Sequence, residues 1–262
     1  MKINTIGFIG FGNMAQAMVK GMLLKQTAAP SQIYACAKNW DKLQKTAAGY
    51  GIHACRTAAE VAAAADLILV AVKPYLVEEV LTPIKDLLAD KALVSVAVNF
   101  PFAKYETFLK PGTHHMSTLP NTPIAVGEGV IMCEQQHSLN EEELEAFHRF
   151  FGPAALIKEI DTAHLGIAGT ISGCGPALTA MYIEALADAA VLHGLPRALA
   201  YQIASQTIVG TGKLQLESGD HPGVMKDAVC SPGGTTIVGV TTLERKGFRA
   251  AVIDSIDAIM KK

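Results

Sequence analysis

The sequence predicts an α/β protein, with a doubly wound parallel sheet in the first part of the chain and an all-α second part. Strand and helix patterns alternate through the first half, which is typical of a parallel sheet covered by helices on both faces. After about Asp161 the strand patterns vanish and long helical patterns take over. We therefore expect two domains, over residues 1–160 and 161–262.

Four strands are expected in the first domain, near residues 2–9, 32–36, 66–72 and 92–98. The segment at 66–72 is almost wholly apolar, as in a strand buried on both faces, and Lys73-Pro74 ends it. Ligands of open parallel sheets bind beyond the carboxyl ends of the strands. Residues 71–74, residues 97–99 and the loop Pro120-Asn121-Thr122-Pro123 should therefore converge on a ligand.

The first strand leads into a glycine loop, Gly10-Phe11-Gly12-Asn13-Met14-Ala15, and a helical pattern follows at once. This strand, turn and helix context distinguishes a dinucleotide loop from a chance glycine motif. Gly10 permits the tight turn, Gly12 lets the backbone approach a pyrophosphate, and Ala15 lets the helix pack close to the strand. We interpret the loop as a pyrophosphate site; the alternative is a glycine-rich turn without a ligand.

The end of the second strand indicates which dinucleotide is bound. Proteins that prefer NADH usually place Asp or Glu there for the ribose hydroxyls, whereas Ala37-Lys38-Asn39 offers no acid and does offer a cation. This favours NADPH, with NADH as the alternative. The competing interpretation of Lys38 is a solvated lysine that opens the next helix.

A second glycine loop, Ser231-Pro232-Gly233-Gly234-Thr235-Thr236, precedes an apolar pattern of helical spacing that begins at Ile237. Backbone N–H groups of such a loop, together with the positive end of a helix dipole, hold a carboxylate or phosphate without Lys or Arg. We interpret this loop as an anion site. Two alternatives are that Ser231 stabilises a turn and that Thr236 caps its helix.

Composition narrows the class of protein. The chain has 262 residues, 50% of them hydrophobic, and 22 Lys and Arg against 24 Asp and Glu, so nothing indicates a nucleic acid or an anionic membrane as partner. The N-terminus lacks the basic and apolar segments of a secretory signal, so we expect a cytoplasmic protein. Asp66, Glu184 and Asp188 interrupt the longest apolar stretches, which argues against a membrane span.

The second domain carries one helix that needs burial on several sides. An apolar stripe follows it with helical spacing, formed by Leu178, Met181, Ala185, Ala189 and Leu192. A domain of about a hundred residues covers such a helix most economically with another subunit, so we expect a homo-oligomer.

No metal site is expected. His114 and His115 are adjacent on a predicted strand and would point to opposite faces, and Glu184 and Asp188 form a polar stripe on their helix. The five cysteines, an odd count, lack metal-type spacing and are expected to be reduced.

Five motifs in order resemble those of the delta-1-pyrroline-5-carboxylate reductase family, across essentially the whole chain. The resemblance implies an N-terminal Rossmann domain, a C-terminal domain that intertwines with its mate in a homodimer, and further assembly into a decamer of five dimers. It also implies reduction of the cyclic imine 1-pyrroline-5-carboxylate to L-proline by NAD(P)H, the last step of proline biosynthesis. The motifs are Ile9 to Ala15, Ala71-Val72-Lys73-Pro74, Pro120-Asn121-Thr122-Pro123, Ser172-Gly173-Cys174-Gly175-Pro176-Ala177 and Ser231 to Thr236.

The resemblance further implies roles for single residues. It places the cofactor against Ile9, Gly10, Phe11, Gly12, Asn13 and Met14 at the pyrophosphate, Ala37, Lys38 and Asn39 near the adenosine ribose, and Ala71, Val72, Lys73, Pro74 and Ala97 at the adenosine and nicotinamide walls. It places the substrate carboxylate at Ser231, Gly233, Gly234, Thr235 and Thr236, with Thr236 near the imine nitrogen. The active site is expected between the two domains, with two chains contributing. Lys73 is a second candidate for a catalytic hydrogen-bond donor, or else a helix-capping or solvated lysine.

Some positions depart from the usual family pattern. Ser117 stands where arginine is common before Pro120. Leu178 stands where a tyrosine often follows the Gly-Pro pair, and Val98-Asn99 stands where an alanine-glycine pair is common. We interpret these changes as altered pocket or packing details, since both glycine loops remain intact.

Two other functions remain open at the level of sequence. One is a catalytically silent, nucleotide-binding dimeric regulator. The other is a different two-domain dehydrogenase, such as a 3-hydroxyacid dehydrogenase, for which Lys213 is the only internal helical base candidate in the second domain.

Overall fold

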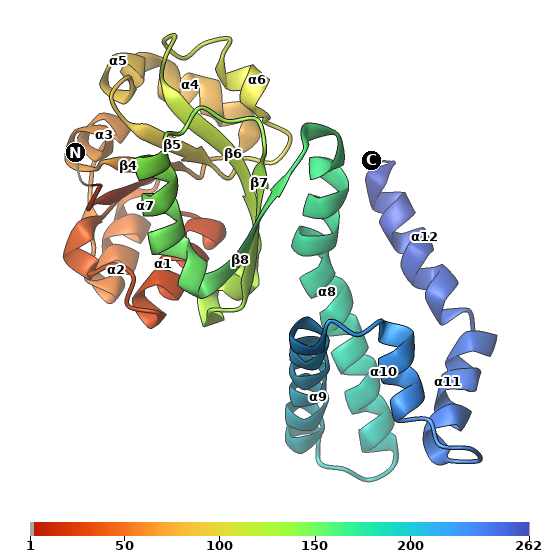
Figure 1. The fold of residues 1–262 in the computed structure, drawn as a ribbon. Coiled ribbons are helices and arrows are strands. Elements are labelled where there is room, and N and C mark those ends of the chain that lie inside the picture. Colours follow the sequence, from red (N-terminus) through yellow and green to blue (C-terminus); the bar gives the residue numbers. More distant parts are fainter. Residues whose placement is uncertain (1–2, 262) are drawn as a thin grey trace. The chain divides into compact units, whose positions relative to one another are not determined.

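The computed structural model of the chain describes residues 3–261 (Figure 1). These residues divide into two compact units, and the division falls between Gly173 and Cys174. The first unit is built around a sheet, and the second unit is wholly helical.

Eight strands form the sheet, in the order β3-β2-β1-β4-β5-β6-β7-β8. The first six are parallel, in the arrangement of dinucleotide-binding sheets, which confirms the predicted doubly wound fold. Strand β7 runs antiparallel to β6, and β8 runs parallel to β7. The strands are β1 Ile6–Ile9, β2 Ile33–Cys36, β3 His53–Ala54, β4 Leu67–Val70, β5 Ala92–Ser95, β6 His114–Pro120, β7 Gly129–Glu134 and β8 Ala155–Ile160.

All four expected strands are present, and each is shorter than expected. Of the strand expected at 2–9, residue 2 lies outside the described residues, and β1 begins at Ile6. The strands expected at 66–72 and 92–98 end at Val70 and Ser95, because the chain turns into loops at the carboxyl edge before the apolar sequence ends.

Helices cover both faces of the sheet, because alternate residues of each buried strand point to opposite sides. In β4, Leu67 and Leu69 belong to one buried cluster, and Ile68 and Val70 belong to the other. The first cluster packs under α1 (Asn13–Leu24), α2 (Trp40–Tyr50) and α7 (Glu141–Phe151). The second packs under α3 (Ala58–Ala64), α4 (Val77–Leu81), α5 (Lys85–Leu88) and α6 (Phe102–Tyr105).

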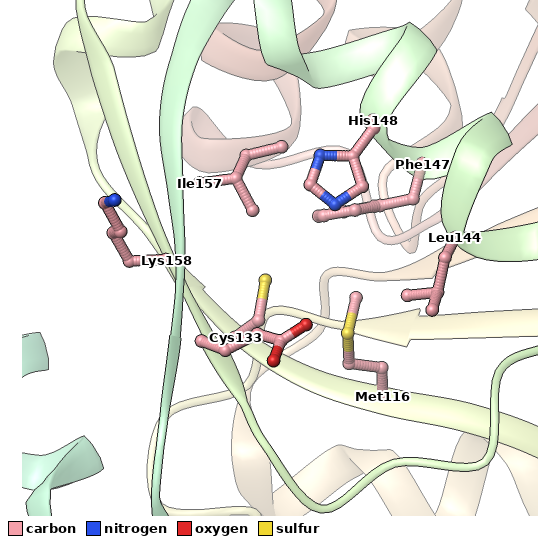
Figure 2. A pocket seen from close by; sticks show the side chains of 8 residues that line it. Met116, Cys133, Leu144, Phe147, His148, Ile157 and Lys158 are labelled. Carbon is pink, nitrogen blue, oxygen red and sulfur yellow. The ribbon is translucent and has the colours of Figure 1, made fainter. Parts of the chain in front are cut away.

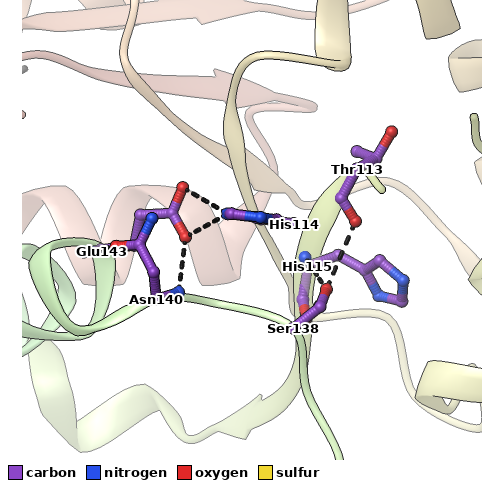
Figure 3. A network of polar contacts seen from close by, with 6 residues as sticks. All are labelled: Thr113, His114, His115, Ser138, Asn140 and Glu143. Atoms are coloured by element: carbon purple, nitrogen blue, oxygen red, sulfur yellow. Dashed lines mark hydrogen bonds and ion pairs between the residues drawn. The ribbon is translucent and has the colours of Figure 1, made fainter. Parts of the chain in front are cut away.

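A polar network joins α7 to the start of β6 (Figure 3). The Glu143 carboxylate accepts hydrogen bonds from the Asn140 backbone N–H (2.8 Å) and from His114 Nδ1 (2.8 Å). The Asn140 side chain in turn accepts from the Glu143 N–H, a reciprocal cap of the helix. Ser138 Oγ accepts from the His115 backbone N–H and donates to the Thr113 carbonyl, which fixes the approach to the helix.

The first part of α8 runs beside the end of β6 that extends past β5. Strand β7 ends at Glu134, whose buried carboxylate accepts from the Thr162 hydroxyl (2.7 Å) at the start of α8. The register places this contact level with the carboxyl end of β5: Cys133 pairs with Thr118, so Glu134 lies beside Ser117, which pairs with Ser95. Ten residues later, the Ser172 carbonyl accepts from Asn121 Nδ2, just beyond the carboxyl end of β6.

The second unit contains little core of its own. Its helices are the rest of α8 (Thr162–Leu192), then α9 (Arg197–Ser218), α10 (Pro222–Ala228), α11 (Thr235–Arg245) and α12 (Phe248–Met260). Between Cys174 and Lys261, the buried residues of the isolated chain are the alanines 187, 200 and 204. Large apolar side chains are exposed, such as Met181 (67%) and Leu192 (82%).

By length and composition alone, α8 is the one helix of the described chain that could cross a membrane. Core helices of soluble proteins meet the same criterion, so it does not by itself assign α8 to a lipid bilayer.

Candidate functional site

The predicted cofactor segments come together at the carboxyl edge of four neighbouring strands. The sheet register aligns Ile9 of β1 with Cys36 of β2 and with Val70 of β4, and Val70 with Ser95 of β5. The predicted segments at 9–14, 37–39, 71–74 and 97 directly follow or overlap these strand ends. The topology therefore brings together residues that are almost ninety positions apart in sequence.

Gly10 is required for the turn that leaves β1. Its φ is +94°, a conformation that side chains with a Cβ rarely adopt, and an added Cβ would lie 2.7 Å from the Ala71 backbone. The Gly10 N–H donates to the Cys36 carbonyl (3.0 Å), and the Ala71 N–H donates to the Ile9 carbonyl (2.8 Å). Any larger residue here would displace the loop from the ends of β2 and β4.

Gly12 has a different property: the space beside it is open. An added Cβ would meet no atom within 4 Å, and φ is −83°, so the backbone does not itself demand glycine. Gly12 is the N-cap of α1, no side chain caps this helix, and its first turn carries no acidic residue. The first N–H groups of α1 therefore face open space and can accept an anionic ligand.

At the end of β2, Asn39 rather than Lys38 opens the next helix. Its side chain accepts from the Lys42 N–H (3.0 Å) as the N-cap of α2. The alternative role of Lys38 as the residue that opens the helix is therefore wrong, and its side chain is exposed beside this turn.

The ends of β4 and β5 contribute backbone and small side chains. Lys73 is exposed and is the N-cap residue of the short 3-10 helix Pro74–Leu76, although its side chain makes no capping hydrogen bond, so its position agrees with the alternative of a helix-capping or solvated lysine. Ala97 is buried, with its N–H bonded to Ser95 Oγ (3.1 Å). Asn99 has φ +59°, which explains why a glycine suits this position and why asparagine replaces it at modest strain.

The second glycine loop forms a tight turn before α11. The Gly234 N–H donates to the Ser231 carbonyl (3.0 Å), Pro232 and Gly233 are the central residues, and Gly233 has φ +70°. These features define a type II turn, which needs glycine at its third position. Ser231 thus contributes its carbonyl to the turn, while its hydroxyl is left for other contacts.

Helix α11 begins at Thr235, two residues before the predicted pattern at Ile237, because the turn delivers the chain directly into helical geometry. Its N-cap is Gly234, and no side chain caps it. Thr236 is the second helical residue and is exposed, so its predicted alternative as a cap is wrong. Within residues 3–261 its hydroxyl has no hydrogen-bond partner, which leaves it available to a ligand.

Asn121 joins two of the sequence motifs, a role that sequence reasoning missed. Pro176 lies inside α8 and has no N–H, so the Ser172 carbonyl lacks its usual donor four residues ahead. Asn121 Nδ2 supplies that hydrogen bond (3.0 Å), and its Oδ1 accepts from the Val130 N–H (2.8 Å). The internal proline was the signal that an outside donor was needed.

Ser117, one of the departures from the family pattern, is buried and donates to the Phe100 carbonyl (2.9 Å). It therefore stabilises the loop between β5 and α6. His115, two residues before Ser117 on β6, is also buried, with Nε2 2.6 Å from Glu106 Oε1 and its ring stacked on Phe102. Burial lowers the pKa of His115, and the Glu106 contact opposes that shift only in part.

His114 and His115 point to different partners, Glu143 and Glu106, as the strand alternation predicts. Across residues 3–261, no group of three His, Cys, Asp or Glu residues could hold a metal ion. The five cysteines are free thiols.

A cavity of about 300 Å³ lies between α7 and the strands β6, β7 and β8 (Figure 2). Its wall is mostly apolar, with Met116, Leu144, Phe147 and Ile157, and includes the Cys133 thiol. None of the predicted site residues lines it, so it is not part of the predicted cofactor site.

Comparison with known families divides the chain into two matched regions. Residues 5–99 match a family described as NADP oxidoreductase coenzyme F420-dependent. Residues 162–262 match the family of pyrroline-5-carboxylate reductase dimerisation. The first match covers β1 to β5 with the first glycine loop, and the second covers helices α8 to α12.

Individual relatives match over nearly the whole length. Pyrroline-5-carboxylate reductase of Escherichia coli is 41% identical over 98% of this chain and 96% of its own, and that of Treponema pallidum is 40% identical over 97% and 98%. The crystal structure of Plasmodium falciparum pyrroline carboxylate reductase with NADP bound is 31% identical, with a TM-score of 0.87 over 98% of this chain and 96% of its own. The fold, both glycine loops and these full-length similarities agree: the chain belongs to the pyrroline-5-carboxylate reductase family.

Proposed function

We propose that this chain reduces 1-pyrroline-5-carboxylate to L-proline with NADPH, or with NADH, as the last step of proline biosynthesis. The observation that carries the proposal is the full-length similarity to reductases of that name, with both glycine loops present. Both loops lead into helices, α1 and α11, that have glycine as N-cap and no side-chain cap.

The residues at the carboxyl edge suit a dinucleotide. Residues Ile9 to Met14 would hold the pyrophosphate on the first turn of α1, where no side chain of the protein occupies the open space at Gly12. Ala37, Lys38 and Asn39 would contact the adenosine ribose, and residues 71–74 with Ala97 would wall the adenosine and nicotinamide. When bound, the cofactor supplies a hydride.

The second loop would hold the substrate. Ser231, Gly233, Gly234 and Thr235 would bind the carboxylate through backbone N–H groups and hydroxyls, and the free hydroxyl of Thr236 would bond the imine nitrogen. A protonated imine is a strong electrophile and can take its proton from water, so orientation rather than a perturbed acid provides most of the acceleration. Lys73, exposed beside Pro74, is the second candidate donor.

The test is an NADPH oxidation assay with the cyclic imine, with proline measured as product. Thr236→Ala should lower turnover by about tenfold or more, the loss of one hydrogen bond to the reacting group, while NADPH affinity stays unchanged. Gly12→Val should weaken the binding of NADPH because the side chain fills the open space, without a steric clash inside the protein. Thr241→Ala, which removes a hydroxyl bonded to Val238 in the same helix, is the matched control and should retain turnover.

Wild-type turnover in Thr236→Ala would refute the role of that hydroxyl. Tight NADPH binding without imine reduction by the native protein would instead favour the silent, nucleotide-binding regulator. Oxidation of a hydroxyacid in place of imine reduction would favour the other dehydrogenase class.

The working assembly is also a proposal. The functional boundary lies near residue 160, with a cofactor domain over 1–160 and a dimerisation and substrate domain over 161–262. We place the protein in the cytoplasm as a homodimer, with five dimers forming a decamer. Light scattering should give a mass of two or ten times that of one chain, and a monomer would contradict the assembly.

A further inference from the structure

Arg56 is a cation at the cofactor edge that the proposed function has not used. It follows β3, and β3 pairs with β2 through Tyr34 with His53 and Ala35 with Ala54. The Cys55 N–H also donates to the Ala35 carbonyl (2.8 Å), so the chain leaves β3 beside the end of β2. Arg56 therefore emerges next to the Ala37-Lys38-Asn39 segment, although seventeen positions separate it from Asn39.

The guanidinium of Arg56 is held in place by an aromatic ring. Its Cζ lies 3.8 Å from the centroid of Trp40, the first residue of α2 and the neighbour of the N-cap Asn39. Planar stacking on an aromatic ring leaves the N–H groups of a guanidinium free to donate. The side chain is thus positioned without consuming its hydrogen-bonding capacity.

The charge of Arg56 is not neutralised within the protein. Its backbone N–H donates to Glu60 Oε2 (2.8 Å), but its guanidinium forms no ion pair with any carboxylate in the described chain. Lys38 is exposed on the adjacent strand end, and no acid stands in the 37–39 segment. Two cations, Lys38 and Arg56, therefore lie beside the position where β2 ends, and the Glu60 carboxylate is the acid near it.

We infer that Arg56, stacked on Trp40, binds the 2′-phosphate of NADPH together with Lys38 and makes the protein prefer 2′-phosphorylated dinucleotides. A guanidinium forms paired hydrogen bonds with phosphate oxygens, whereas a ribose hydroxyl gives it much less to bind. One oxygen of the Glu60 carboxylate, Oε2, accepts from the Arg56 backbone N–H at the start of α3. The inference rests on the proposed function for the identity of the cofactor.

The test separates the 2′-phosphate from the rest of the nucleotide. Adenosine 2′,5′-bisphosphate and 5′-AMP are titrated by calorimetry into the native protein, Arg56→Ala, Arg56→Lys and the control Lys45→Ala, which removes an exposed charge from α2. Arg56→Ala should lower the affinity for the bisphosphate by about tenfold to a hundredfold, because charge-assisted hydrogen bonds are lost. It should change the affinity for 5′-AMP by less than about twofold. The affinity of Arg56→Lys for the bisphosphate should lie between those of the native protein and Arg56→Ala, and the affinity of Lys45→Ala should equal that of the native protein.

Trp40 gives an independent readout, because it is the only tryptophan of the chain. Its fluorescence should change when the bisphosphate binds the native protein and change less with 5′-AMP. In kinetics, Arg56→Ala should raise KM for NADPH and leave KM for NADH and both kcat values unchanged.

Equal weakening of both nucleotides in Arg56→Ala would overturn the inference and leave Arg56 as a support for the strand edge. Unchanged affinity for both would overturn it as well. If the native protein binds the bisphosphate through Arg56 yet reduces no imine with either cofactor, the proposed function fails and the 2′-phosphate site stands.

Discussion

The two compact units of this chain differ in how they bury apolar side chains. The first unit packs two clusters of buried residues against the two faces of its sheet. The second unit, over the part that the structure describes, buries alanines and exposes residues such as Met181, Leu192 and Leu216. A helical region that leaves its largest apolar side chains uncovered obtains little stability from its own chain, since burial of such groups is the main source of folding free energy.

The difference also separates two kinds of glycine loop. The glycine loop of the first unit is anchored by backbone hydrogen bonds to β2 and β4, so its geometry is fixed by the sheet. The loop at 231–236 is fixed by a local turn and by the start of α11. The first loop depends on contacts distant in sequence, and the second depends on a few adjacent residues.

The largest expected effect comes from adding charge to the uncovered helical surface. Met181→Glu should abolish assembly and lower the melting temperature of the helical region, because an unpaired charge buried at an interface costs about 3 to 5 kcal/mol. Light scattering and circular dichroism measure the two effects. The control is Leu87→Glu on α5, which is 47% exposed in the first unit and should change stability by about 0.5 kcal/mol or less. If Met181→Glu remains assembled, this side chain is not part of the subunit contact.

A smaller loss is expected in the first unit on removing its buried amide. Asn121→Ala leaves the Ser172 carbonyl and the Val130 N–H without their partners, which should lower the free energy of unfolding by about 2 to 3 kcal/mol in urea denaturation. Pro176→Ala gives α8 its own donor for Ser172. In a protein that already carries Pro176→Ala, the loss of unfolding free energy caused by Asn121→Ala should therefore be smaller. Strictly additive costs would show that the proline and the amide are not linked.

The smallest effect concerns pH. Burial lowers the pKa of His115 below its usual 6.5, so below that pH the unfolded chain binds more protons than the folded one. Stability should therefore fall on acidification, with His115 contributing at most about 1.4 kcal/mol per pH unit. His115→Gln should flatten the plot of melting temperature against pH below about 6.5. Parallel plots for the two proteins would assign the acid sensitivity to other groups.

Much of the first unit could be predicted from the sequence because its signals are local. The apolar strand at Leu67–Val70 and the glycines that need positive φ, Gly10 and Gly233, are visible without tertiary contacts. The direction of β7 and the pairing of β8 cannot be inferred from local sequence. They depend on which edge of the sheet is still unpaired when the chain comes back to it. The two-residue strand β3 is too short to give a periodic pattern.

The same distinction applies to the site. The two loops were predicted from glycine, hydroxyl and helix signals. The hydrogen bond of Asn121 to Ser172 could not be predicted in this way, because it depends on α8 passing the end of β6. Arg56 was missed for a related reason: only strand pairing brings it to Trp40, and its own neighbours in sequence give no indication.

Strand β6 outruns its parallel neighbour, and this extra length decides how the polypeptide departs from the sheet. Strand β5 ends at Ser95, level with Ser117, whereas β6 continues to Pro120 and pairs over those last residues with β7. Strands β7 and β8 end level with Ser117, and α8 starts there, at the contact of Thr162 with Glu134. Ten helical residues, about 15 Å, then carry the backbone along this overhang to Ser172 beside Asn121. Three residues of one strand thereby set the direction in which α8 leaves the carboxyl edge.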